Sequence, residues 1–278
     1  MSLYIRKAFG GREALSEEKM RESFVRAGAD SRLAAQTSRA VLARLSPRAT
    51  TDDVYRHALG HFIKTNPSVA VKYSLKRAMM HLGPAGHVFE HYIGRMFHEY
   101  GYTTEVGKMV QGKCVMHEVD VLARKGKAHY MIECKYHNQL GVRSDIKVAM
   151  YTHSRFLDIR DAWEQSEKHT DVHQGWLVTN TKPTKEAIQY AACVGLRIIA
   201  WRYPRRWGLE YFIERKKLYP ITILPSFPHE ALERVSVAGV LLVADVLRYT
   251  PRDFAMQFAI DGVRAAKMFQ EAKRLMQK

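Results

Sequence analysis

Charged side chains interrupt two short, otherwise apolar segments, and their types and spacing could do chemistry. Asp120 lies in the first segment, and Glu133 and Lys135 lie in the second. Side chains on a strand alternate between its two faces, so Glu133 and Lys135 share one face. The turn at residues 124–127 allows the two strands to pair as a hairpin, which brings Asp120 towards them. The spacing therefore predicts two carboxylates and an ammonium group in one place.

Two carboxylates that lie close together repel each other unless a cation stands between them. Oxygen ligands alone favour a hard cation such as Mg²⁺ or Mn²⁺. A metal bound in this way polarises a phosphoryl oxygen and activates water. The pattern therefore predicts hydrolysis at phosphate, and a surface ion pair at the edge of a sheet is the simpler alternative.

The elements around these residues extend the pattern. A predicted helix from residue 86 carries Gly-His-Val-Phe-Glu, ending at Glu90, and Gly-Tyr follows at 101–102. Downstream, the pattern predicts a strand, a helix and a strand at 175–180, 187–192 and 196–200. Over about residues 84–203 this order resembles the PD-(D/E)xK nucleases, and specifically their Mrr-like restriction endonuclease branch.

The resemblance implies a restriction endonuclease-like α/β core, a mixed sheet flanked by helices, that hydrolyses DNA. It implies that Glu90, Asp120, Glu133 and Lys135 are catalytic. The metal, Mg²⁺ or Mn²⁺, would be held by the three carboxylates and by the backbone carbonyl of Cys134. Lys135 would stabilise the developing charge or help to deprotonate the water.

Nearby polar residues are weaker candidates. Glu118 shares a strand face with Asp120 and is a further ligand or a solvated side chain. His137 follows Lys135 on the same face and could assist. Arg155, on a helix predicted at 144–168, could contact a phosphate, although a helix-surface position is the default expectation.

The composition fits a nucleic-acid partner. The 278 residues include 44 Lys and Arg against 28 Asp and Glu, a formal net charge of +16. Neutralisation of phosphates drives non-specific binding of nucleic acid, so DNA is the natural partner, with a basic but unrelated soluble protein as the alternative. The excess is spread along the chain, without a basic tail.

Cysteine content and the missing motifs exclude several classes. The three cysteines form no C-x-x-C pair, so neither a disulfide framework nor a zinc site is indicated. We read no signal peptide and no apolar stretch of membrane-spanning length, and therefore expect a cytoplasmic protein with no membrane partner. P-loop, G-x-S-x-G and H-E-x-x-H patterns are absent.

The N-terminal region predicts a short hairpin that turns at 10–11, followed by helices. Its opening resembles the ATP-cone, a regulatory nucleotide-binding module. The resemblance implies binding of ATP or dATP as an effector. Ala8 and Tyr55 depart from the usual basic residue and histidine, and a helical domain without nucleotide binding is the alternative. The residues implied in nucleotide binding are Ile5, Lys7, Glu13, Lys19 and Thr51.

The C-terminal region predicts short helices at 230–235, 240–247, 251–258 and 262–276. The turn into the last of them resembles a helix-hairpin-helix, which implies contact of Gly262, Arg264 and Lys267 with DNA phosphates. A helical bundle for packing or dimerisation is equally favoured. Separately, Arg205 and Arg206 stand beside aromatic residues and suit phosphate contact, with a solvated loop as an equally favoured alternative.

Together these patterns predict three domains: an ATP-cone-like domain at 1–82, the nuclease domain at 83–224 and a helix-hairpin-helix-like module at 225–278. The leading hypothesis is a metal-dependent DNA endonuclease regulated by ATP or dATP. The alternative is a catalytically inactive, nucleotide-sensing, DNA-binding regulator. In a third hypothesis the ATP-cone sets the state of a homo-oligomer.

Overall fold

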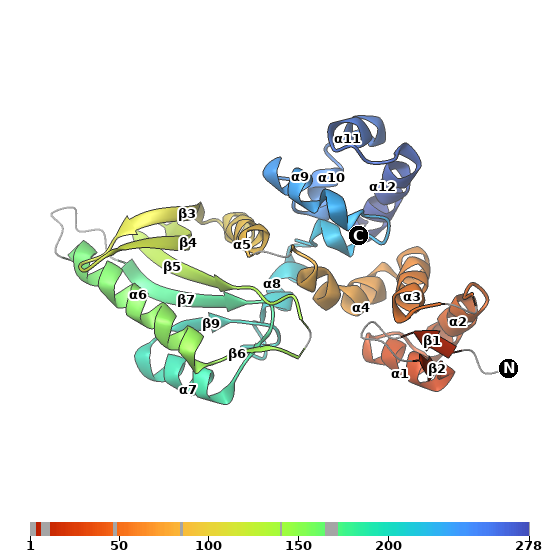
Figure 1. The fold of residues 1–278 in the computed structure, drawn as a ribbon, viewed down its shortest axis with the longest axis horizontal. Helices are drawn as coiled ribbons and strands as arrows, with labels where there is room; N and C mark the ends of the chain where they lie inside the picture. The colour runs from red at the N-terminus through yellow and green to blue at the C-terminus, as the bar shows by residue number, and fades with distance from the viewer. Residues whose placement is uncertain are drawn as a thin grey trace. The chain divides into compact units, whose positions relative to one another are not determined.

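The chain folds into two compact units, one helical and one built on a sheet (Figure 1). The predicted regions 1–82 and 225–278 fall largely in the same unit, and the three-domain division stays a prediction. The computed structural model describes residues 4–6, 12–46, 49–83, 86–139, 141–164 and 172–277. The helical unit comprises Met1–Ala78, Ile221–Ala231 and Val243–Lys278, and the sheet unit comprises Met79–Pro220 and Leu232–Leu242.

The helical unit begins with the predicted hairpin, in which Ile5 pairs with Glu13. The predicted N-terminal helices are confirmed, because their starts carry side-chain caps: Ser16 accepts from the amide of Lys19, and Thr50 from that of Asp53. The elements are β1 (Tyr4–Arg6), β2 (Arg12–Ala14), α1 (Glu17–Arg26), α2 (Ser31–Leu42), α3 (Thr51–Thr65) and α4 (Pro67–Met80).

An aromatic cluster forms the core of the N-terminal helices. The ring of Phe24 lies 5.1 Å from Phe62 and 5.6 Å from Tyr73, in edge-to-face arrangements. Phe24 and Phe62 have no exposed surface. Burial of such rings is the main stabilising contribution to helices this short, because propensity alone leaves them marginal.

The C-terminal helices were predicted close to their observed bounds, but their last turn differs from the expectation. Ala259, not a glycine, takes the left-handed conformation between α11 and α12, with φ of 47°. Gly262 is the first residue of α12, and Asp261 caps the helix by accepting the amide of Arg264 at 2.9 Å. The elements of this part are two short 3₁₀ turns (Ile221–Ile223, His229–Ala231), α10 (Val243–Val246), α11 (Pro251–Gln257) and α12 (Gly262–Met276).

The second unit is a mixed five-stranded sheet in the order β3-β4-β5-β7-β9. The first three strands are antiparallel neighbours, and β5, β7 and β9 run parallel, as the predicted fold class requires. The elements are α5 (His87–Glu99), β3 (Thr103–Gln111), β4 (Met116–Lys125), β5 (Ala128–Lys135), β6 (Arg143–Ser144), α6 (Ile146–Glu164), β7 (Val172–Thr179), β8 (Lys182–Pro183), α7 (Lys185–Val194), β9 (Arg197–Ile199), α8 (Leu209–Arg215) and α9 (Leu232–Val237).

Helices cover both faces of the sheet. On one face α5 approaches β3 so closely that a methyl group at Gly94 would stand 2.7 Å from the side chain of Val106. On the other face α6 runs along the strands (Figure 1), and its Ala149 packs in one cluster with Leu177 of β7 and Ala187 of α7. Because both faces are covered, the central strands bury apolar side chains such as Ile132, Leu177 and Val178.

The β3–β4 ribbon changes its packing partner halfway along its length. Val121 lies under α5, whereas Val119, two residues earlier, packs with Ile159 of α6. Residues two apart on a regular strand share a face, so the regular alternation must break between them. The break coincides with Gly107, which has φ of 63° on β3, and with Asp120, which lies between the paired residues Val119 and Val121 on β4. Asp120 therefore lies where the ribbon turns from one helix to the other.

Candidate active site

The three predicted carboxylates converge from one helix and two strands. The β4–β5 ladder ends at the pair Val121 and Ile132, so Asp120 and Glu133 lie just beyond it, where the strands part. The Asp120 carboxylate accepts the amide of Cys134 at 2.7 Å, which fixes it at the end of the ladder. Glu90 comes from the first turn of α5. The charge of Asp120 raises the pKa of both glutamates, so the three carboxylates are close enough to interact.

Burial and mutual repulsion make these carboxylates harder to ionise. Burial, followed by the charges of Asp120 and Glu118, raises the pKa of Glu90 to about 7. Burial, followed by the charge of Asp120, raises the pKa of Glu133 to about 7. Burial also raises the pKa of Asp120 itself. A cation among these groups would offset both effects, so the donors fit a hard metal ion.

A buried arginine already holds one of these carboxylates. Arg155 of α6 forms an ion pair with Glu133, and their side chains are 10% and 15% exposed. The default expectation of a helix-surface position for Arg155 was therefore wrong. A signal was present: Thr152, Arg155 and Ile159 fall at helical spacing on one face, and all three are buried.

The other predicted site residues on β5, Cys134 and Lys135, follow Glu133 directly. Lys135 is exposed at the end of β5, and its charge lowers the pKa values of Asp120 and Glu133 against the effect of burial. Cys134 is buried, as expected for a residue on the opposite strand face. Within the described residues, no group of three His, Cys, Asp or Glu side chains is arranged to hold a metal ion as it stands.

A polar network that the sequence did not predict ties β5 to the end of β7. Asn180 accepts the amide of His137 at 2.9 Å and donates to the His137 carbonyl at 2.7 Å, as a neighbouring strand would. The His137 ring lies 3.1 Å from the hydroxyl of Ser144, which donates to Thr179. These hydrogen bonds fix the chain that follows Lys135, and they occupy the backbone and the ring of His137.

A second unpredicted network anchors the β3–β4 turn to α6. Asp158 accepts the amide of Cys114 at 2.8 Å and lies 2.7 Å from Nε2 of His117. The hydrogen bond from His117 is the main cause that lowers the pKa of Asp158 to about 2. His117 therefore has a structural position in this anchor.

The predicted nucleotide-binding residues do not form one described site. Lys7 lies outside the described residues, and Lys19 is exposed on α1. Thr51 opens α3, but the capping box of Thr50 and Asp53 satisfies donors at this helix start. The carboxylates of Asp52 and Asp53 in the first turn put negative charge where a triphosphate was expected.

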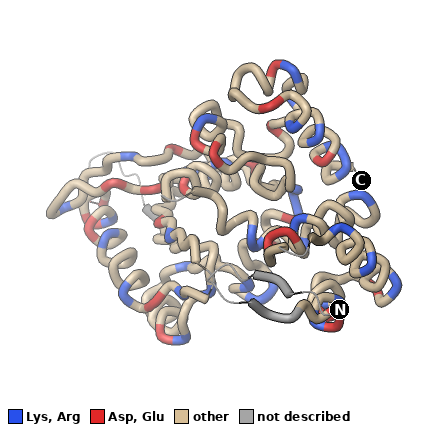
Figure 2. Tube along the Cα trace, turned by 45° about the vertical axis from the view of Figure 1, so that its right-hand side comes forward, with Lys and Arg blue, Asp and Glu red and all other residues tan. Residues whose placement is uncertain are grey.

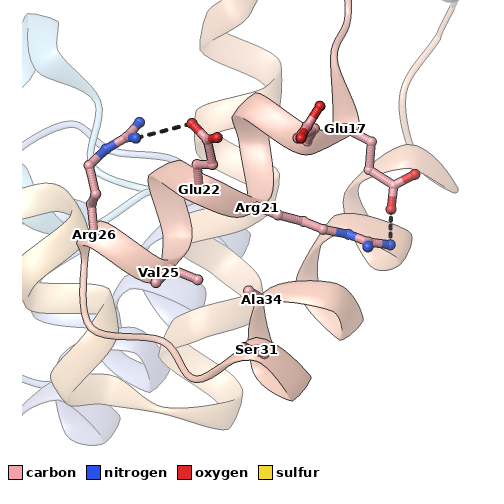
Figure 3. Close-up of a pocket in the computed structure, with 8 residues that line it drawn as sticks. Glu17, Arg21, Glu22, Val25, Arg26, Ser31 and Ala34 are labelled. Atoms are coloured by element: carbon pink, nitrogen blue, oxygen red, sulfur yellow. Dashed lines mark hydrogen bonds and ion pairs between the residues drawn. The ribbon is translucent and has the colours of Figure 1, made fainter.

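A pocket of about 760 Å³ lies between α1 and α2 in the same region. Figure 3 shows that its arginines are already engaged: Arg21 with Glu17, and Arg26 with Glu22. A third carboxylate, Glu18, also lines it. The pocket therefore offers little net positive charge to a phosphate.

The predicted DNA-contacting residues fall in both units. Arg205 and Arg206 are exposed in the loop before α8, and the neighbouring Trp207 is 50% exposed. Arg264 and Lys267 are exposed on α12. Basic positions are spread over the whole trace in Figure 2, as the sequence indicated. In the part of the chain that the structure describes, no helix is long and apolar enough to span a membrane.

Comparisons with known proteins agree with the sheet unit. Residues 84–205 match the restriction endonuclease family model, a range that contains all three carboxylates. An uncharacterized protein of Archaeoglobus fulgidus is 39% identical over 184 residues, which are 66% of this chain and 99% of that protein. A crystal structure of a protein of unknown function, 38% identical, is similar with a TM-score of 0.58 over 68% of this chain and 97% of that one.

Proposed function

The chain belongs to one family with the Archaeoglobus fulgidus protein and carries a restriction endonuclease domain at residues 84–205, and on this premise we propose that it is a metal-dependent DNA endonuclease. The observation that carries the proposal is the convergence of Glu90, Asp120 and Glu133 where β4 and β5 part. Phosphodiester hydrolysis needs positive charge beside the phosphate and a positioned water, and these residues can organise both.

Asp120, Glu133, Glu90 and the Cys134 carbonyl are the groups that would hold Mg²⁺ or Mn²⁺, which supplies a polarised phosphoryl oxygen and activated water. The pKa values of Glu90 and Glu133 are raised because negative charge is concentrated here, and a bound cation would neutralise that charge. Lys135, exposed at the end of β5, places an ammonium group where a DNA phosphate can approach from solvent. Its role is to stabilise the charge that develops on the phosphate.

Cleavage of plasmid DNA and of single-stranded DNA, with Mg²⁺ or Mn²⁺ and then with a chelator, tests this function. We expect cleavage only with metal, and loss of it in Glu133→Ala and in Lys135→Ala. Glu105→Ala is the matched control, because Glu105 is exposed on β3 and pairs with Lys108. Equal cleavage by the wild type and both site variants, all purified to homogeneity, would show that this is not the active site.

The ion pair of Arg155 with Glu133 favours a second candidate, the inactive DNA-binding regulator. In that case the arginine permanently replaces the cation among the carboxylates, and the fold binds DNA without cutting it. The discriminating measurement is the same cleavage assay with Arg155→Gln included. A regulator binds DNA but does not cut it with either divalent metal, in the wild type or in the variant.

Regulation by ATP or dATP rests on the order of the N-terminal elements and on the resemblance to the ATP-cone. The effect of each nucleotide on cleavage rate, and on mass in light scattering, tests it. We expect a change in at least one of them. No change with either nucleotide would remove the effector and the nucleotide-set oligomer from the proposal.

A further inference from the structure

A second cleft lies wholly inside the helical unit, between α3 and α12. Its volume is about 630 Å³, within the usual range for ligand sites. Pro225 and Ser226 contribute to it from the chain between the two helices. The lining residues that set its chemistry are Arg44, Arg56, Gly60, Lys64, Lys267 and Arg274.

The cleft is strongly basic, and its acidic residues are already engaged. Asp53 accepts the amide and hydroxyl of Thr50 and pairs with Arg56. Glu271 is buried and accepts the amide of Ser226 at 3.1 Å and its hydroxyl at 2.8 Å. These contacts occupy both carboxylates. Against these two acids stand Arg44, Arg56, Lys64, Arg264, Lys267 and Arg274.

Most of the basic side chains remain available. Arg264 is held by the Ser226 carbonyl at 3.0 Å and belongs to the wall of the cleft. Among the described residues, no carboxylate lies within ion-pair distance of Arg44, Lys64, Lys267 or Arg274, in contrast to the paired arginines of Figure 3. Unpaired cations that share one cleft repel one another, and a bound anion would reduce this repulsion.

The helical spacing directs the cations towards each other across the cleft. Arg56, Gly60 and Lys64 are four residues apart and follow one face of α3. Lys267 and Arg274 are seven apart and follow one face of α12. An added methyl group at Gly60 would meet no atom within 4 Å, so the α3 face is open between its two basic residues.

The lining favours phosphate groups over bases. No Phe, Tyr or Trp is among the described residues that line the cleft. Stacking of unpaired bases uses aromatic side chains, whereas contacts to the phosphate backbone use Lys and Arg and are indifferent to sequence. Two facing rows of cations without an aromatic platform match a run of phosphates.

We propose that the cleft between α3 and α12 is a second, non-catalytic site that binds the phosphate backbone of DNA without sequence preference. It extends the predicted contact at Lys267 to a surface that includes Arg44, Lys64 and Arg274, residues with no predicted role. The nuclease site then cuts DNA that the helical unit helps to hold. The ligand class rests on the proposed function, but binding is measurable without cleavage.

The test uses the full chain and a fluorescently labelled DNA duplex in buffer with a chelator, so that nothing is cut. Binding is followed by anisotropy over a range of salt concentrations for the triple variant Lys64→Gln, Lys267→Gln and Arg274→Gln. Removal of one phosphate-binding cation should lower the salt slope by about one, so we expect a fall of about two to three. At moderate salt the affinity should fall by at least about tenfold.

The matched control removes the same charge elsewhere in the helical unit, by Arg39→Gln, Lys72→Gln and Lys273→Gln, which are exposed and outside the cleft. This control variant should lower the slope of DNA affinity against salt concentration by less than about one. Equal effects of the two triple variants, or an unchanged slope in the cleft variant, overturn the site. Thermal unfolding confirms that each variant is folded.

A second pair of variants changes no native side-chain contact. Gly60→Glu places a carboxylate in the open part of the cleft and should weaken DNA binding, whereas Gly60→Ala should not. If ATP or inorganic triphosphate binds the wild type and not the triple variant, while DNA binding is equal in both, the ligand is a nucleotide and the DNA assignment fails. A failed nuclease proposal looks different: binding is intact and cleavage is absent.

Discussion

Charge is concentrated in two places in this protein. One is a buried cluster of carboxylates, and the other is an exposed cleft of basic side chains. In the sheet unit, Glu90 and Glu133 are partly or largely buried, and their pKa values rise to about 7. In the helical unit, Lys64 and Lys267 are exposed along an open cleft. Buried like charges interact strongly over a few ångströms and suit a small, dense cation, whereas exposed ones suit an extended polyanion. In our proposal, the carboxylate site cuts DNA and the basic cleft holds it.

Disabling one site and measuring the function of the other tests whether cutting and holding are separate. Asp120→Asn removes the charge that both Glu90 and Glu133 sense while keeping the size of the side chain. Metal-assisted stabilisation of several kcal/mol corresponds to a loss of cleavage on the order of a thousandfold. The measurement is single-turnover cleavage beside duplex binding in a chelator.

DNA affinity should not fall in Asp120→Asn, because the proposed holding site lies in the other unit and the substitution removes a negative charge. The cleft triple variant is the reciprocal case, with weakened binding and an intact set of carboxylates. If Asp120→Asn weakens DNA binding as much as cleavage, the two functions are not separate.

We expect the free energy of unfolding to depend on the ion pair between Arg155 and Glu133. Arg155→Ala leaves a mostly buried Glu133 carboxylate without its partner. Removing one member of a buried ion pair costs about 3 kcal/mol in the free energy of unfolding. Urea denaturation of the chelator-treated protein measures it.

Arg160→Ala is the control on the same helix. Arg160 is 38% exposed and pairs with Glu164 at 3.3 Å, so its loss should cost less than about 1 kcal/mol. Equal losses in the two variants would mean that the pair of Arg155 with Glu133 is no more than a surface ion pair.

The sequence predicted the parts of this site that follow from local periodicity. Alternation on β4 and β5 predicted Asp120, Glu133 and Lys135 as a group, and the turn at Gly126 made their strands neighbours. Glu90 required the resemblance to a family, because nothing in its own helix marks it. The structure describes all four in the sheet unit, and their chemical roles stay a prediction.

What the sequence missed depends on contacts between distant segments. Arg155 is buried because Glu133, 22 residues earlier, receives it. The basic cleft joins Lys64 with Lys267, and no local pattern connects such distant residues. An even spread of charge along the chain therefore concealed a local concentration in space.

The pKa of Asp158 shifts in the opposite direction from those of Glu90 and Glu133. Hydrogen bonds, first from His117, lower the pKa of Asp158 to about 2 instead of raising it. The charged form is thus the one that the fold favours. Its contribution to stability is present above the ordinary pKa of an aspartate and is lost as the pH falls towards 2.

Asp158→Asn should lower the Tm at neutral pH and flatten its decline between about pH 4 and pH 2. Asp161→Asn is the matched control, because Asp161 lies on the same helix and its contacts with Arg160 and Lys113 are more exposed. A wild type and an Asp158→Asn variant with parallel acid unfolding curves would contradict this account of the β3–β4 anchor.

The smallest effect is expected for the acid inside the basic cleft. Burial, opposed by the Ser226 hydrogen bonds, raises the pKa of Glu271. Because the folded protein favours the protonated form, its contribution to stability is complete below the ordinary pKa and is lost as the pH rises through the raised value. Glu271→Gln should remove this dependence of stability on pH.

The same substitution deletes a negative charge near the proposed phosphate site, so it should tighten DNA binding by about threefold to tenfold. Anisotropy at about pH 5 and pH 8 measures the effect, and the advantage of Glu271→Gln should grow with pH as the native carboxyl ionises. An advantage that is equal at the two values would place the Glu271 charge outside the field that the DNA senses. The cleft would then lose its assignment as the holding site, because Glu271 lines it beside Lys267 and Arg274.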